Sequence, residues 1–165
     1  IRLLGCAAAA TLLAACSGDQ LAPLHPMLGN WSGIHRLAGD ATGYSAQYHV
    51  HETDGGLSWN FHSDWNGGFT GQSAQRWDAA SKEFVEIWTD SSDPDRKLET
   101  RGTWDAASST LTMRGTGPDW ETGEPIGYTH RTHLLNADSW TYTMTAERAV
   151  GAIEVMWIEM KRVRP

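Results

Sequence analysis

The sequence lacks several features by which a fold or an activity is usually assigned. It has only two cysteines, Cys6 and Cys16, both close to its beginning, so a disulfide inside a folded domain is not expected. Motifs for a nucleophilic serine (G-x-S-x-G), a zinc protease (H-E-x-x-H) and a phosphate-binding P-loop are all missing. Basic charge is scarce as well. With a formal net charge of −7, the chain has no electrostatic attraction to a phosphate backbone, and nucleic acid is not expected as a partner.

Apolar runs long enough to span a membrane are also missing. A shorter apolar run at the start of the chain has the pattern of a secretory signal. Arg2 precedes a run of small and apolar residues at 3–14, which is too short to span a bilayer as a helix. The Leu-Ala-Ala-Cys motif ending at Cys16 resembles the lipobox of bacterial lipoproteins. That resemblance implies that residues 1–15 are a lipoprotein signal peptide, that Cys16 is lipidated, and that residues 16–23 form a tether. The alternative is an ordinary signal peptide cut near Ala15.

Lipidation would decide where the protein resides. Several acyl chains on one residue give lasting membrane attachment, which a single chain does not. Ser17, directly after the cysteine, resembles the outer-membrane sorting signal of bacteria with two membranes. We therefore expect a protein of the bacterial cell envelope, anchored by lipid to the outer membrane and facing the periplasm.

After Gly29 helical periodicity is hard to find, and apolar residues alternate with polar ones. Residues 44–51 and 57–65 each place aromatic or aliphatic side chains on one face and polar ones on the other. An Asp-Gly pair at 54–55 favours a two-residue type I′ turn between them. This turn pairs His51 with Ser58 and His49 with Asn60, and it puts the apolar residues of both strands on one side. For the next hairpin we predict a three-residue loop, Asn-Gly-Gly at 66–68.

The five residues Trp-Asp-Ala-Ala-Ser occur twice, at 77–81 and 104–108. In both copies a tryptophan ends an alternating run and another such run follows, while Asp and Ser can bond the backbone of a tight loop. A four-residue loop would place each tryptophan on the face of the apolar residue seven positions later, Phe84 or Leu111. The repeat therefore predicts one kind of hairpin used twice. Asn-Ala-Asp-Ser at 136–139 is a looser third instance.

The pattern as a whole predicts an all-β fold. Further strands are expected at 31–37, 97–104, 127–135, 140–147 and 152–162, which brings the total to about ten. Loops rich in Gly, Pro and Asp are expected at 91–95 and 115–125, and a short helical turn near 21–27. Sequential antiparallel strands would curl and close, which removes exposed edges. We therefore predict an up-and-down antiparallel β-barrel domain over residues 24–165.

Several short motifs point to a family. Gly-x-Trp at the first strand, with Trp31, is followed by an early hairpin with two glycines, a Trp-Asp hairpin and a last strand ending in basic residues. This order resembles calycin-like barrels, among them the lipocalin-like and nitrobindin-like barrels and the bacterial domain of unknown function family 1579. The resemblance covers about residues 24–163. It implies a barrel closed at one end by Trp31 and open to a ligand at the other.

Histidines are the main candidates for chemistry. His49 and His62 are diagonal neighbours on the polar face of the first hairpin, and they are a candidate zinc pair that needs a third ligand. A solvent face and a polar lumen are the other interpretations. His130 and His133 point to opposite faces of one strand, so they cannot chelate together. His130 is therefore a candidate acid–base group or a core polar group. Nitrobindin-like relatives bind haem through one histidine in this region, so haem stays an alternative, and no cofactor is required.

Nine tryptophans are many for this length and need a large core or a cavity with aromatic walls. One aromatic face is either the packed interior of the barrel or the wall of a pocket. Ten strands enclose more room than eight, which favours the pocket. The predicted ligand-binding residues are Tyr44, Tyr48, Trp59, Phe61, Trp77, Trp104 and His130.

Three functions remain open from the sequence. The first is a binding protein that holds a small apolar or aromatic ligand inside the barrel. The second is an enzyme that uses His130 or the His49 and His62 pair. The third is a scaffold lipoprotein that presents Trp120 in the 115–125 loop to a partner.

Overall fold

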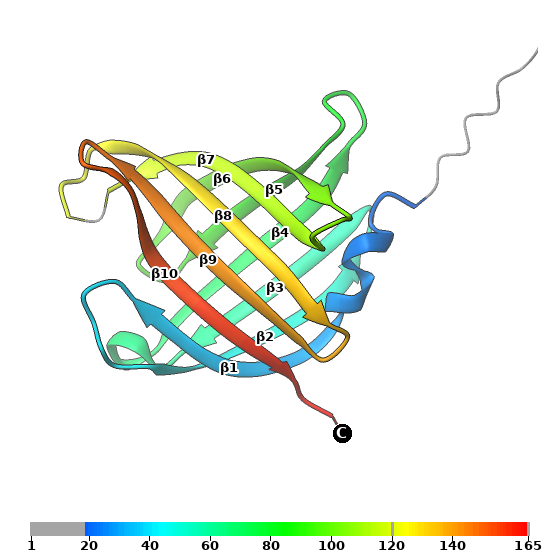
Figure 1. Cartoon of the computed structure of the whole chain (residues 1–165), viewed down its shortest axis with the longest axis horizontal. Helices are drawn as coiled ribbons and strands as arrows, with labels where there is room; N and C mark the ends of the chain where they lie inside the picture. Colours follow the sequence, from blue (N-terminus) through cyan, green and yellow to red (C-terminus); the bar gives the residue numbers. More distant parts are fainter. Residues whose placement is uncertain (1–18, 120, 165) are drawn as a thin grey trace, which may run out of the picture.

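The computed structural model describes residues 19–119 and 121–164. Within these residues, ten antiparallel strands form a closed barrel in which each strand pairs with its neighbours in sequence and β1 pairs with β10 (Figure 1). The predicted up-and-down barrel is therefore confirmed, with a short 3₁₀ turn at its start. Membrane-spanning helices are not found in the described part of the chain.

Among the described residues, two 3₁₀ turns accompany ten strands that run in alternating directions along the barrel. Their bounds are η1 (Ala22–Met27), β1 (Gly29–Leu37), β2 (Tyr44–Thr53), β3 (Gly56–Ser63), η2 (Trp65–Gly67), β4 (Phe69–Asp78), β5 (Glu83–Asp90), β6 (Asp93–Asp105), β7 (Thr110–Pro118), β8 (Pro125–Asn136), β9 (Ser139–Arg148) and β10 (Gly151–Arg162). The β2–β3, β4–β5, β6–β7 and β8–β9 hairpins lie at the end of the barrel that carries η1 (Figure 1).

The first predicted hairpin has the expected register. His51 pairs with Ser58, His49 pairs with Asn60, and only Asp54 and Gly55 connect the strands. The turn type is different from the prediction, because Gly55 has a φ of +80° whereas Asp54 is not among the described residues with positive φ. A type I′ turn needs positive φ at both positions. The apolar pattern therefore set the register without that turn type.

The second hairpin has a longer loop than predicted. Ser63 pairs with Phe69, so five residues connect β3 and β4 instead of three. Trp65, which we expected at the end of a strand, lies in the 3₁₀ turn η2. Because three and five are both odd, Phe69 and Trp77 still point to the expected side of the sheet.

The repeated Trp-Asp-Ala-Ala-Ser segments form the same kind of hairpin, as predicted. Trp77 pairs with Phe84, and Trp104 pairs with Leu111. In the first copy the Asp78 carboxylate accepts a hydrogen bond from the backbone N–H two residues on, at 3.0 Å, and the corresponding bond in the second copy is 2.9 Å. The residue that ends each loop, Lys82 or Ser109, has a positive φ of 57° or 49°. The repeat is therefore a turn sequence that forms the same kind of hairpin loop twice.

Two predicted loops are shorter than expected. The strand β6 begins at Asp93, inside the segment predicted as a loop over 91–95. The strands β7 and β8 extend to Pro118 and from Pro125, so their connection is confined to 119–124. Pairing with the neighbouring strand recruits these Pro- and Asp-containing residues into the sheet, which local propensity alone did not indicate.

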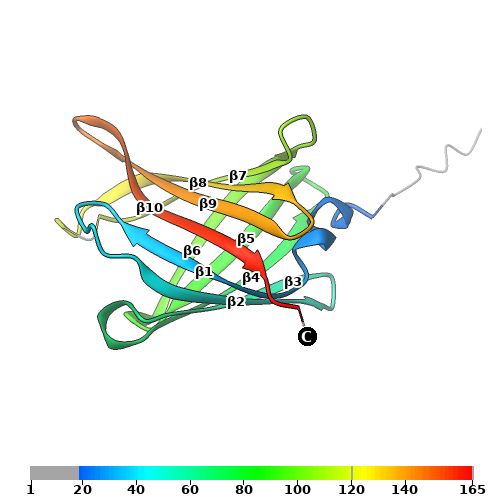
Figure 2. The ribbon, with the colours of Figure 1, turned by 60° about the horizontal axis from the view of Figure 1, so that its bottom comes forward.

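One end of the barrel is covered by η1. Leu24 and Met27 are fully buried there, and the Trp31 indole N–H donates to the Met27 carbonyl at 2.7 Å. Arg162, at the end of β10, stacks its guanidinium over the Trp31 ring at 4.2 Å and donates to the Leu28 carbonyl at 2.7 Å. The first and last strands are thus tied to η1, and Trp31 has the structural position expected for it. Figure 2 shows β10 between β1 and β9, with the C-terminus at this end.

Candidate functional site

A buried carboxyl group lies inside the barrel. Glu86 of β5 shares the inward face with Phe84 and Trp88, and it pairs across the sheet with Gln75 and Thr100. The Thr100 hydroxyl donates a hydrogen bond to the Glu86 carboxylate at 3.2 Å. The Ser73 hydroxyl also faces this carboxyl, at a geometry short of a full hydrogen bond. Burial raises the pKa of Glu86 above its ordinary value, and the two hydroxyls only partly offset that effect.

Two tyrosines approach Glu86 from other strands. Burial raises the pKa of Tyr48, on β2, and the negative charge of Glu86 raises it further. Burial also raises the pKa of Tyr142, on β9, followed by the charges of Tyr48 and Glu86. Both phenols are therefore neutral at physiological pH. Since β2, β5 and β9 belong to different parts of the barrel wall, these groups meet within the lumen.

His130 of β8 extends this polar group. Its ring lies 5.7 Å from the Tyr142 ring, edge to face. Burial lowers the pKa of His130 to about 4, so the imidazole is uncharged near neutral pH. The expectation that His130 and His133 point to opposite faces is confirmed, since His130 faces inward while His133 is exposed on the outer face.

Two hydroxyls of this group have no hydrogen-bond partner among the described residues. Buried side-chain nitrogens and oxygens without a partner in the described residues belong to His35, His51, Trp59, Ser73, Gln75, Trp140 and Arg148. Tyr48 and Tyr142 are not in that set, although neither hydroxyl hydrogen-bonds to another described residue. Because that set contains only fully buried atoms, both hydroxyls must retain some accessible surface. The raised pKa values nevertheless show that both phenols lie deep inside the protein. Both observations hold if the hydroxyls face unfilled lumen.

Aromatic rings form the walls around this space. The Tyr48 ring lies 6.3 Å from Trp59 at 89° and 4.6 Å from Phe61 at 34°. Trp88 lies against Gly71 on the neighbouring strand, where an added methyl group would be 2.1 Å from the Trp88 ring. The small residue at that position therefore permits the Trp88 ring to lie where it does. The central part of the lumen combines flat apolar walls with the Glu86 carboxyl group, the Tyr48 and Tyr142 phenols and the neutral His130 imidazole.

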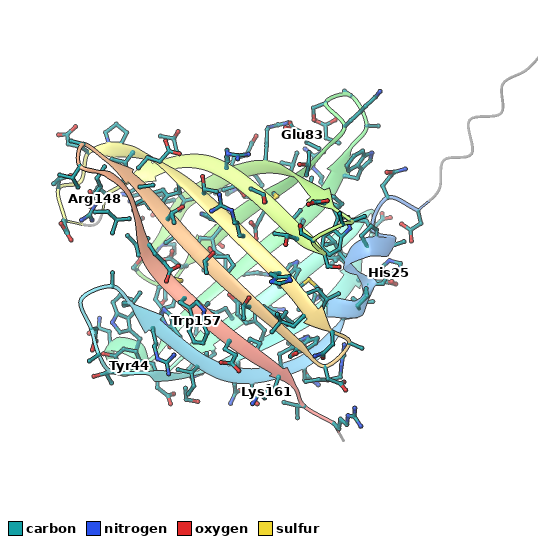
Figure 3. All side chains as sticks on the ribbon, in the orientation of Figure 1. His25, Tyr44, Glu83, Arg148, Trp157 and Lys161 are labelled. Carbon is teal, nitrogen blue, oxygen red and sulfur yellow. The ribbon has the colours of Figure 1, made fainter. Side chains whose placement is uncertain are left out.

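The seven predicted ligand-binding residues all lie on inward-facing positions, but the structure does not bring them to one place. Tyr48, Trp59, Phe61 and His130 lie in the central part. Trp77 and Trp104 lie two residues before the β4–β5 and β6–β7 loops, at the η1 end, where Trp77 packs on Phe84 at 5.1 Å. Tyr44 lies at the opposite end, where its hydroxyl bonds the Asp40 carboxylate and its ring lies 6.3 Å from His35. Figure 3 shows Tyr44 and His25 at opposite ends.

The predicted histidine face is on the outside of the barrel. His49 and His62 are both exposed, and the His49 ring bonds the Asn30 side chain at 2.7 Å and stacks on His51 at 5.1 Å. No group of three or more metal-ligating side chains is found among the described residues. A hollow of about 460 Å³ lies here, lined by the outward-facing His49, Asn60 and His62 and also by Trp31, Tyr48 and Phe61. Of the three interpretations of this face, the solvent-facing one matches its position.

Comparison with known proteins identifies the family of the chain. The family model of proteins of unknown function DUF1579 matches residues 20–162. The chain belongs to the DUF1579 family. This family was among those that the Gly-x-Trp opening and the order of hairpins resembled.

A solved structure supports the calycin-like fold of this DUF1579 chain. The crystal structure of Rv2717c from M. tuberculosis aligns with a TM-score of 0.63, at 14% sequence identity, over 89% of this chain and 99% of that chain. At this identity the similarity concerns the fold alone. No curated protein matches the chain significantly.

Sequence reasoning missed the central residues of the DUF1579 chain's lumen. Glu86 and Tyr142 were not predicted as site residues, and neither was Trp88. Once Trp77 pairs with Phe84, alternation places Glu86 and Trp88 on the same inward face, so the pattern contained the signal. His35 was missed as well. It is 1% exposed, its ring nitrogen Nδ1 lies 3.1 Å from the Ser63 hydroxyl, and burial lowers its pKa.

Two predicted features fall elsewhere. The signal peptide, residues 16–18 of the tether with Cys16, and Trp120 in the β7–β8 connection lie outside the described residues. The two ends of that connection are described. Asp119 is 4% exposed and bonds Arg148 at 2.8 Å, which ties this loop to β9.

Proposed function

We propose that this DUF1579 protein binds a small, largely apolar or aromatic molecule inside its barrel. The observation that carries the proposal is a pair of inward tyrosine hydroxyls without partners in the described residues, set among aromatic rings. Tyr48 and Tyr142 direct hydroxyls with no partner in the described residues into the lumen, beside Glu86. Ligand sites typically combine apolar walls with a few convergent polar groups in this way.

Unpartnered groups in the wall add support. The Trp59 indole N–H and the Gln75 side-chain oxygen are buried without a hydrogen-bond partner in the described residues. Each such group destabilises the empty barrel by about 1–3 kcal/mol, and a ligand that reaches it would recover part of that loss. The entrance would be the end opposite η1, since Leu24, Met27 and Trp31 close the η1 end.

The alternative of acid–base catalysis rests on the inward position of His130. With a pKa of about 4, His130 is a weak base at neutral pH and does not carry the proton that a general acid must donate. Binding therefore accounts for the site better than catalysis does.

Titration with a neutral, environment-sensitive apolar dye tests the proposal. The dye should quench tryptophan fluorescence, and Trp59→Ala should weaken its binding by about 1–2 kcal/mol, because stacking area is lost from the wall. His62→Ala is the matched control on the outer face of the same strand and should leave the affinity unchanged. The opposite result, in which only His62→Ala removes binding, would place the ligand on the outer hollow and refute the lumen site.

The proposal includes a place in the cell. The signal-like start and the lipobox around Cys16 support a lipid-anchored protein of the bacterial envelope, on the outer membrane and facing the periplasm. Wild-type protein expressed in its host should incorporate labelled palmitate and sediment with membranes, and Cys16→Ala should do neither. Unlabelled wild-type protein in the soluble fraction would contradict the anchor without affecting the binding proposal.

A further inference from the structure

We infer that the lumen is selective for organic cations, and that the Glu86 carboxylate pairs with a substituted ammonium group attached to an apolar or aromatic body. The inference rests on the proposed function, because it names the chemical class of ligand that the same cavity would take. It is argued from the charge inside the barrel, the arrangement of the rings and the lack of any cation near Glu86 in the described structure.

The lumen has one acidic group without a basic partner. Most lysines and arginines among the described residues lie on the outer face or in loops. Arg148 and Arg162 occupy inward-facing positions at the ends of the barrel, and Arg96, which has the strand parity of Leu98 near the start of β6, is exposed and pairs with Asp93 at 2.9 Å. Arg148 is engaged by Asp119 and Glu121, at 2.8 Å each, and Arg162 by the carbonyls beside η1. In the described structure, the Glu86 carboxylate is therefore stabilised only by two neutral hydroxyls, those of Ser73 and Thr100.

A buried carboxylate without a cation is unfavourable. It must either take up a proton or attract a positive charge, since the desolvation penalty applies only to the ionised form. A ligand that brings an ammonium group into the lumen would supply that charge at the place where the protein does not. An anionic ligand would meet the opposite situation, with repulsion from Glu86, while the described inward-facing arginines at the barrel ends are already paired.

The rings packed around Tyr48, whose phenol interacts electrostatically with Glu86, suit a cation as well. Aromatic faces attract cations at about 6 Å or less from the ring centre, and tryptophan and tyrosine do so more strongly than phenylalanine. Tyr48 and Trp59 stand nearly perpendicular, at 89° and 6.3 Å, and Tyr48 and Trp140 lie at 63° and 5.3 Å. Two walls at an angle can each contact a bulky ammonium group, while the phenol oxygens of Tyr48 and Tyr142 add acceptors near it.

Three probes that share one naphthalene body test the inference with the full chain. One carries a trimethylammonium group, the second its neutral tert-butyl isostere, and the third a sulfonate. Wild-type protein should bind the cation about tenfold or more tightly than the isostere and should bind the sulfonate most weakly. Glu86→Gln should remove that preference while leaving the affinity for the isostere within about twofold. Glu83→Gln is the matched control, since it removes a charge from the outer face of the same strand (Figure 3).

The wild-type protein provides a second measurement, in case Glu86→Gln does not fold. Affinity for the trimethylammonium probe should fall as pH is lowered and Glu86 takes up a proton, whereas affinity for the isostere should stay constant. The groups facing Glu86 are Tyr48 and Tyr142, neutral throughout because their pKa values are raised, with His130 beyond them, neutral above its pKa of about 4. Equal affinities for cation and isostere, or tighter binding of the sulfonate, would overturn the inference and leave the binding proposal intact. Failure of all three probes to bind would overturn both.

Discussion

Protonation of His130 should destabilise the barrel in a pH range that can be calculated. The folded protein holds this imidazole neutral, with a pKa of about 4 against 6.5 for an unburied histidine. The unfolded chain therefore binds more protons than the folded one between these values, so the free energy of unfolding falls as pH decreases. The stabilisation is complete above pH 6.5 and is lost progressively down to about pH 4. The full difference of about 2.5 pKa units corresponds to roughly 3 kcal/mol, of which about 2 kcal/mol is lost by pH 5.

Urea unfolding followed by tryptophan fluorescence at several pH values between 7.5 and 4.5 measures this effect. The quantity to compare is the change of unfolding free energy with pH in the wild type and in His130→Gln, because other titrating groups then cancel. His133→Gln, on the outer face of the same strand, should keep the wild-type pH dependence. If wild type and His130→Gln lose stability in parallel, His130 is not held neutral by burial and its assignment to the lumen is wrong.

Two further predictions concern the ends and the centre of the barrel. Trp31→Ala should lower the free energy of unfolding by about 3–5 kcal/mol, because the ring is buried beneath η1 and supports the Arg162 contact; a loss below 1 kcal/mol in urea unfolding would contradict the closed η1 end. For Glu86, burial raises the folded pKa, so the wild type is destabilised as pH rises through that pKa while Glu86→Gln is not. The stability difference in favour of the variant should therefore grow as pH rises above 4.5, the ordinary pKa of this carboxyl group, and a constant difference would show that Glu86 reaches bulk water.

Much of the fold was determined by the sequence alone. Alternation of apolar and polar residues in most segments predicted the strands, and the Asp-Gly loop and the repeated Trp-Asp-Ala-Ala-Ser loops predicted where several of them reverse. The β3–β4 loop is two residues longer than predicted. Because side chains in a strand alternate with a period of two, the residues of β4 still point to the predicted side of the sheet. The seven residues predicted to line the lumen all lie on inward-facing positions for the same reason, whereas Trp65, also predicted on that strand face, lies in η2.

Only the tertiary structure decided which inward-facing residues meet. Closure of the barrel brings Glu86, Tyr48 and Tyr142 together from β5, β2 and β9, which are not neighbours in the sheet, and no local pattern encodes a distance across a lumen. It also separates Trp77 and Tyr44, which share a face in sequence, to opposite ends of the barrel. Alternation determines the side of a strand on which a residue lies. Its height along the barrel depends on the stagger of all ten strands, and its partners across the lumen depend on closure.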